Sequence, residues 1–202
     1  EIDRYVKIVQ TELQAGESFR SAYQAALVGM LTSKNFYYLE EGTAGERRAR
    51  INDRELASRL SYFLWSSMPD DELFPAARTG TLTKPEVLRA QLTRMLGDAK
   101  LHRFTSAFPR QWLQLHRVGQ FPADPGLYPD YDKWLEESMV LETTLYFDAV
   151  FKENLSLREF LSSDWTMLNP RLALHYGMPP LKSTTFEKVK LRPEDHRGGL
   201  LT

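Results

Sequence analysis

Residues 131–152 read YDKWLEESMVLETTLYFDAVFK and form the longest predicted helix of the 202-residue chain. Leu135, Leu145 and Tyr146 fall on one face of such a helix, because residues three, four and seven apart lie above one another. Glu142 shares this face, since it follows Leu135 by seven residues and precedes Tyr146 by four. The stretch therefore predicts a long helix that carries one acidic side chain among its inward-facing apolar residues.

The same helical period continues on both sides of this stretch. Downstream, Asn169 and Pro170 begin a short helix that closes at Gly177, and only residues 185–191, TFEKVKL, alternate as a strand does. Upstream, helical spacing covers residues 2–13, 19–31, 53–65, 85–96 and 100–115. The sequence therefore predicts an all-α fold, an irregular multi-helix bundle with an N-terminal helical hairpin and at most one small strand pair near the C-terminus.

Glycine and charged residues divide the chain. We expect an N-terminal helical hairpin domain at 1–41, a linker at 42–52 that contains GTAGERRAR, and a main helical domain at 53–202. The basic run RRAR at 47–50 has no aromatic residues interleaved and predicts a solvated loop. Because the chain begins with glutamate, not methionine, we interpret it as a fragment of a longer protein.

Composition excludes several classes of function. The chain has 26 basic and 27 acidic residues, so no overall charge favours nucleic acid or an anionic membrane as a partner. It has no cysteine, which excludes disulfides, a thiolate nucleophile, thiolate zinc sites and covalent c-type haem within these residues. No apolar run approaches the roughly 18–20 residues of a membrane span. We therefore expect no metal site, no cofactor within the chain and no membrane span.

Three segments in order carry a family resemblance: LASRLSYFLWSSMPDDEL at 56–73, FPRQWLQL at 108–115, and LNPRLALHYGMP at 168–179 with HRGGLLT at 196–202. Together they resemble the planctomycete-type domain of unknown function found in large exported proteins that also carry cytochrome-c-like domains. The resemblance covers roughly 50–202, and 1–41 is similar to the short helical domain that precedes it. It implies a periplasmic or secreted multidomain protein with a covalent c-type haem in a downstream domain.

Two charged residues lie beside apolar stripes of different predicted helices. Arg59 follows Leu56 by three residues and precedes Phe63 by four, and Glu142 lies on the inward face described above. An unpaired buried charge is destabilised by several kcal/mol, so each residue needs a partner. We predict a structural ion pair between Arg59 and Glu142. The alternative is that Glu142 acts as an acid or base on the floor of a cleft.

Two further residues are catalytic candidates. His175 lies in the last turn of a short helix, where a protonated imidazole interacts well with the helix dipole, and we interpret it as a cap of that helix. The alternative is that His175 acts as a base, or as a ligand to a haem of a neighbouring domain. Asp164 lies in SSDWTMLNP at 162–170, which predicts a loop between two helices. Its neighbour Trp165 either fills the core or binds a sugar face.

The leading functional hypothesis is a non-catalytic helical module that docks other domains of one exported polypeptide, including a haem-bearing domain. Exposed Trp and Phe residues around 108–134 are the expected contact surface. The alternative is an enzyme domain, hydrolytic or redox-linked, with an acid/base pocket around Glu142, Asp164 and His175. The HRGG stretch at 196–199 is either a backbone turn that binds an anion or a hinge at a domain boundary.

Overall fold

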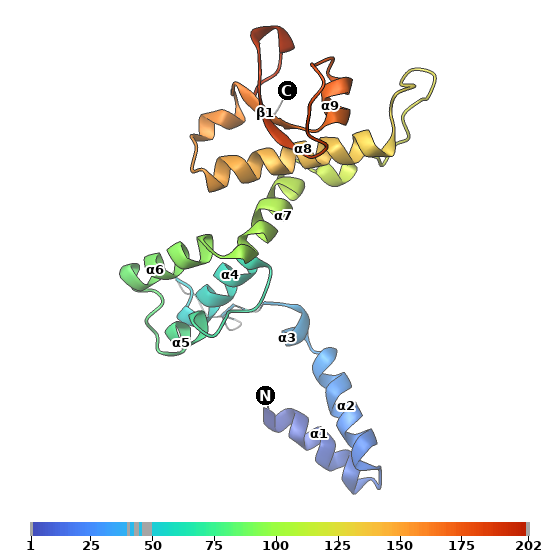
Figure 1. The fold of residues 1–202 in the computed structure, drawn as a ribbon. Helices are drawn as coiled ribbons and strands as arrows, with labels where there is room; N and C mark the ends of the chain where they lie inside the picture. The colour runs from blue at the N-terminus through green and yellow to red at the C-terminus, as the bar shows by residue number, and fades with distance from the viewer. Residues whose placement is uncertain (1, 40, 43–44, 46–49, 201–202) are drawn as a thin grey trace. The chain divides into compact units, whose positions relative to one another are not determined.

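The computed structural model describes residues 2–39, 41–42, 45 and 50–200 (Figure 1). These residues are mostly helical, with one two-stranded antiparallel sheet near the C-terminus, so the predicted fold class is confirmed. The chain divides into two compact units. Residues 1–59 with 71–84 form the first unit, and residues 60–70 with 85–202 form the second unit.

The three-part division drawn from the sequence remains a prediction. Six residues of the predicted linker at 42–52, namely 43–44 and 46–49, lie outside the described residues, and so does most of RRAR at 47–50. Helix α4 (Asp53–Trp65) begins where the sequence predicts the main domain to begin. Its first seven residues nevertheless belong to the first unit and the remaining six to the second.

The first unit opens with a helical hairpin of α1 (Ile2–Gln14) and α2 (Phe19–Leu31). Ser18 caps α2, since its side-chain oxygen accepts a hydrogen bond from the Ser21 N–H at 3.1 Å. The two helices contact each other, as the sequence predicts. The single turn α3 (Lys34–Tyr37) follows.

The rest of the first unit is held by caps and a small apolar core. Asn52 and Glu55 cap the start of α4 reciprocally, each side chain accepting a hydrogen bond from the other's N–H at 3.0 and 2.8 Å. Asp53 accepts a hydrogen bond from the Thr83 N–H at 2.9 Å, which ties the helix start to a distant turn. Helix α5 (Leu73–Arg78) buries Leu73 and Ala77.

The second unit is built around the long helix α8 (Lys133–Lys152). Helix α7 (His102–Trp112) packs on α8, and so do strand β1 (Trp165–Leu168) and helix α9 (Pro170–His175) (Figure 1). Its other elements are α6 (Pro85–Leu96) and the 3₁₀ helices η1 (Ala99–Leu101), η2 (Leu115–Arg117), η3 (Leu157–Phe160) and η4 (Pro193–Asp195). Among the described residues, none of the helices has both the length and the apolar character needed to cross a bilayer.

The sheet pairs β1 with β2 (Glu187–Lys190), so that Trp165 lies opposite Lys190 and Leu168 opposite Glu187. The alternation of residues 185–191 predicts β2 correctly. Strand β1 was expected to be part of a loop, and that expectation is wrong. Because Trp165, Thr166 and Leu168 are all buried, this four-residue strand shows no alternation between apolar and polar side chains.

Two apolar clusters fix the C-terminal part of the second unit to α8. Leu135, near the start of α8, packs with Leu168 and Leu172, and all three side chains are fully buried. Further along the helix, Tyr146 and Val150 pack with Trp165. Helix α8 therefore has one side that carries the sheet and α9, and another that faces α7.

Candidate functional site

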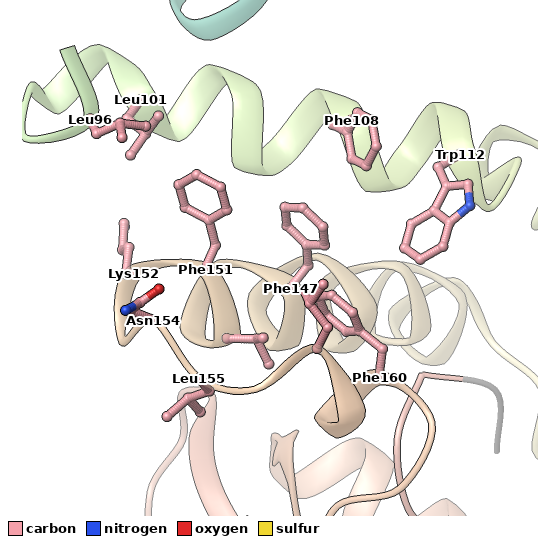
Figure 2. A pocket seen from close by; sticks show the side chains of 12 residues that line it. Leu96, Leu101, Phe108, Trp112, Phe147, Phe151, Lys152, Asn154, Leu155 and Phe160 are labelled. Carbon is pink, nitrogen blue, oxygen red and sulfur yellow. The ribbon is translucent and has the colours of Figure 1, made fainter. Parts of the chain in front are cut away.

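An apolar groove lies in the second unit between α7 on one side and α8 with η3 on the other (Figure 2). Its volume is about 850 Å³. In Figure 2, Phe108 and Trp112 point from α7 toward Phe147 and Phe151 on α8. The lining residues are Leu96, Leu101, Phe108, Trp112, Phe147, Val150, Phe151, Lys152, Asn154, Leu155, Leu157 and Phe160.

The aromatic rings of the groove contact one another. The Phe147 ring stacks on the Phe160 ring with centroids 5.6 Å apart and an angle of 8° between planes. The Phe108 ring lies 5.7 Å from Phe147, and the Trp112 ring lies 6.1 Å from Phe160. Such pairs add about 0.5–1.5 kcal/mol each beyond the burial of their area. The walls are therefore held by ring contacts between segments that are distant in the sequence.

The groove has a buried floor and an exposed rim. Phe147 and Val150 are 5% and 2% exposed, whereas Trp112 on the rim is 52% exposed and Leu157 is 76% exposed. Lys152 is the one charged residue among the described lining residues, and its Nζ lies 2.9 Å from a carboxylate oxygen of Asp148. The groove is therefore suited to binding apolar surface, and no pair of acid and base side chains lines it.

A separate cluster surrounds Glu142 in the interior of the second unit. Glu142 is 7% exposed, as its place on the inward face of α8 predicts. Its two carboxylate oxygens accept hydrogen bonds from the hydroxyls of Tyr176 at 2.7 Å and Thr166 at 2.9 Å. The guanidinium of Arg197 lies 3.5 Å from the carboxylate and 3.7 Å from the centre of the Tyr176 ring. Elements far apart in the chain thus converge on one buried carboxyl.

Burial dominates the electrostatics of this cluster. It raises the pKa of Glu142 above its ordinary value of 4.5, and the hydrogen bonds and Arg197 offset part of that rise. Burial and the adjacent carboxylate also raise the pKa of the Tyr176 phenol. The Tyr176 hydroxyl therefore keeps its proton and remains a hydrogen-bond donor to Glu142.

The raised pKa of Glu142 predicts a pH dependence of stability. Above pH 4.5 the unfolded chain releases this proton while the folded chain retains it, so the free energy of unfolding falls as pH rises toward the folded-state pKa. Glu142→Gln lacks this titration. We expect wild type to lose stability relative to Glu142→Gln as pH rises from 4.5 toward neutrality, measured by urea unfolding at several pH values. Glu137→Gln, at an exposed position of α8, is the control. A wild type that gains stability relative to Glu142→Gln over this range would contradict the prediction.

Within their own units Arg59 and Glu142 have different charged neighbours, and the ion pair between them stays a prediction. Arg59 is 59% exposed at its side chain and pairs with the carboxylate of Glu41 in the first unit. Glu142 has Arg197 as its charged neighbour in the second unit. Spacing along α4 places Arg59 beside the apolar stripe, but this side of the helix is exposed, so a buried partner is not required.

Glu142, Asp164 and His175 have different surroundings in the structure. Asp164 is exposed, and its carboxylate lies 3.9 Å from the Lys190 ammonium of β2. His175 is exposed in the last turn of α9, where its ring contacts the Tyr176 ring at 5.3 Å. Two exposed side chains and one buried carboxyl with its own hydrogen-bond donors lend no support to the acid/base pocket, which stays a prediction.

Other polar side chains have structural partners. Asp70, one of the acids after Pro69, accepts two hydrogen bonds from Arg94, at 2.6 and 3.0 Å. Asn169 caps α9, as predicted, and its amide also donates to the Ser138 hydroxyl at 2.7 Å. In the described part of the chain, no group of three or more acidic or histidine side chains could hold a metal ion.

Sequence reasoning missed most residues of the groove and of the carboxyl cluster. Tyr176 and Arg197 lie in two segments that carry the family resemblance, LNPRLALHYGMP and HRGGLLT, but nothing local points to Glu142 as their neighbour. For the groove, the spacing of Phe104, Phe108 and Trp112 was visible as one helical face. The opposite wall at Phe160 forms because the chain after α8 folds back against that helix, and no local sequence pattern predicts this contact.

Comparison with known proteins gives one family match. Residues 51–178 match the family described as PSD4, protein of unknown function (DUF1592). No curated protein and no solved structure matches the chain. The matched range includes Glu142 and Tyr176 of the carboxyl cluster and every lining residue of the groove.

Proposed function

The chain belongs to the PSD4 family of proteins of unknown function (DUF1592), and from that premise we propose that it is a non-catalytic helical docking module. Its groove between α7 and α8 binds the apolar face of a helix from another domain of the same polypeptide. The observation that carries the proposal is the groove itself, an opening of about 850 Å³ lined by aromatic and aliphatic side chains.

The length of the groove supports a helix as its occupant. From Leu101 to Trp112 the wall extends about 16 Å, at 1.5 Å per helical residue. That length accommodates about three turns of a bound helix, whose apolar residues at positions i, i+3, i+4 and i+7 fit such grooves. Two helices already form the walls, so the occupant completes a helix-packing arrangement of an ordinary kind.

The open rim also favours a protein segment over an enclosed small molecule. Phe108 and Leu96 are 38% and 42% exposed, so an occupant keeps one side in water. An amphipathic helix has a polar side for this position, whereas small-molecule pockets bury most of their ligand. The rim also loses exposed apolar area when a helix covers it, and this burial is favourable.

The wider context forms part of the same proposal and rests on the family resemblance. The polypeptide is exported to the periplasm or secreted, is of planctomycete type, and carries a covalent c-type haem in a downstream domain. No cofactor is assigned to this chain. The haem-bearing domain is one of the domains that the module docks.

An enzyme domain is the second candidate, and one observation favours it. A buried carboxyl with a raised pKa, such as Glu142, is typical of acid/base sites. Against it, Tyr176 and Thr166 occupy both carboxylate oxygens, and Asp164 and His175 are exposed with other neighbours. A structural carboxyl explains these contacts without a reaction.

Two tryptophans provide a matched test of docking. Trp112 on the groove rim is 52% exposed, and Trp134 at the start of α8 is 54% exposed but does not line the groove. We expect a photo-reactive phenylalanine analogue at position 112 of the full-length polypeptide to cross-link to a segment outside residues 1–202. The yield at position 134 should be severalfold lower, as measured by mass spectrometry of the cross-linked peptides.

Three results would contradict this proposal. Equal cross-link yields at positions 112 and 134 would show that the exposure of the side chain alone explains the cross-linking. Cross-links from position 112 to a second copy of the same segment would make the groove a self-association surface. No cross-link at position 112 would leave the groove without a docked domain.

A further inference from the structure

Residues 196–200, which read HRGGL, pack against the rest of the second unit at three successive points. We refer to these five residues as the latch. The first point is Arg197, whose guanidinium lies over the Tyr176 ring at 3.7 Å and faces Glu142 at 3.5 Å. Stacking on a ring and facing a carboxylate are the two contacts that suit a guanidinium best. The latch therefore begins on the carboxyl cluster.

The second point is a close passage of the two glycines over the end of η3 and the loop that follows it. A Cβ at Gly198 would lie 2.7 Å from the carbonyl oxygen of Ser163, and a Cβ at Gly199 would lie 2.7 Å from that of Phe160. Gly199 also has a φ of +82°, which other residues rarely adopt. Its N–H donates to the Ser163 hydroxyl at 3.2 Å. Only glycines allow the latch this close approach.

The third point is Leu200. Its N–H donates a hydrogen bond to the carbonyl oxygen of Phe160 at 3.0 Å. Its side chain packs against the cluster of Tyr146, Val150 and Trp165. The end of the latch is thus bonded to η3 and inserted beside α8.

Phe160 connects the latch to the groove. Its carbonyl oxygen accepts the hydrogen bond from Leu200, and its ring forms part of the groove wall, stacked on Phe147 and 6.1 Å from Trp112. A shift of the backbone at residue 160 therefore moves the ring that closes one side of the groove.

We propose that the latch regulates the groove. While the latch is packed in place, it holds η3 in position and keeps the groove formed. When the latch is released, the Phe160 wall moves away from α7. This inference rests on the proposed docking function and adds a way in which docking is regulated. The HRGG stretch is then neither an anion-binding turn nor a free hinge, because its backbone and its arginine are engaged with the second unit. Residues 196–200 belong to no helix or strand, and such short segments open locally at a lower free energy than a helical core does, which makes the latch a suitable switch.

The absence of cysteine permits a direct measurement of the wall. Leu96→Cys and Leu157→Cys place spin labels on two rim residues of the groove, in a chain with no other thiol. Electron paramagnetic resonance then reports the distance between α6 and η3. Gly198→Ala should displace the latch by its clash with Ser163, and Arg197→Ala removes the guanidinium without adding atoms. Far-UV circular dichroism confirms that each variant is folded.

We expect both latch variants to broaden the label-to-label distribution and shift it to longer distances by about 2 Å or more, the scale of loop rearrangements. Gly126→Ala is the control, since its Cβ would meet only the side chain of Asp124. Unchanged distances in Gly198→Ala and Arg197→Ala would overturn the inference, whatever the groove binds.

A second measurement separates the latch from the docking function. In the full-length polypeptide, Gly198→Ala should lower the cross-link yield at position 112 severalfold, while Gly126→Ala leaves it unchanged. If the label distances shift but position 112 forms no cross-link even without a latch substitution, docking is what fails. If the cross-link forms and Gly198→Ala does not lower its yield, the regulatory role of the latch fails and docking is retained.

Discussion

Trp65→Ala is expected to lower the free energy of unfolding of the second unit by about 3–5 kcal/mol, the range for truncating a large buried aromatic residue. Trp65 is completely buried, and its indole N–H donates to the carbonyl oxygen of Met95 at 3.1 Å. The Lys100 ammonium and the Arg94 guanidinium lie 4.5 and 5.3 Å from its ring centre. Truncation therefore leaves a cavity, removes the indole hydrogen bond to Met95, and leaves two cations without the ring that they face.

Urea unfolding followed by far-UV circular dichroism measures this loss without relying on tryptophan emission. The slope with urea shows whether the second unit still unfolds as one cooperative body. Trp134→Ala is the matched control, since its side chain is 54% exposed and its truncation should change stability by less than about 0.5 kcal/mol. Similar losses in the two variants would contradict the assigned role of Trp65.

Arg197→Ala is expected to lower the free energy of unfolding by about 3 kcal/mol at neutral pH, as breaking a buried ion pair does. The Glu142 carboxylate is 7% exposed and Arg197 is its charged neighbour, so truncation leaves a buried charge. The loss should shrink on acidification. Burial already raises the pKa of Glu142, and removing the arginine raises that pKa further, so a mildly acidic solution neutralises the carboxyl.

A double-mutant cycle isolates this pair. In a Glu142→Gln background the carboxamide carries no charge: its oxygen accepts the hydrogen bond from one of the Tyr176 and Thr166 hydroxyls, and its NH2 group faces the oxygen of the other and donates to it. Arg197→Ala should then destabilise the protein much less, with a coupling of roughly 0.5–3 kcal/mol between the two positions. Free-energy losses that simply add would mean that Arg197 contributes through its stacking on Tyr176 and not through the carboxylate.

The amino-acid sequence determined the helical elements and several of their ends. Periodic apolar residues predict α1, α2, α4 and α8, and Asp53 marks the first residue of α4 correctly. Asn169 caps the helix that it was predicted to begin, and Ser18 caps α2 in the same way. These features depend on residues within one or two turns of each other, so a linear pattern contains their cause.

Only the tertiary structure decided which helical faces are covered and which charged groups meet. Arg59 and Glu142 both lie beside apolar stripes in the sequence, yet one is exposed beside Glu41 and the other is buried beside Arg197. The groove likewise depends on ring contacts of Phe160 with Phe147 and Trp112, and the latch depends on the backbone hydrogen bond from Leu200 to Phe160. Helical spacing fixes a residue's direction on its own helix, whereas burial and partners depend on long-range packing, which no local pattern encodes.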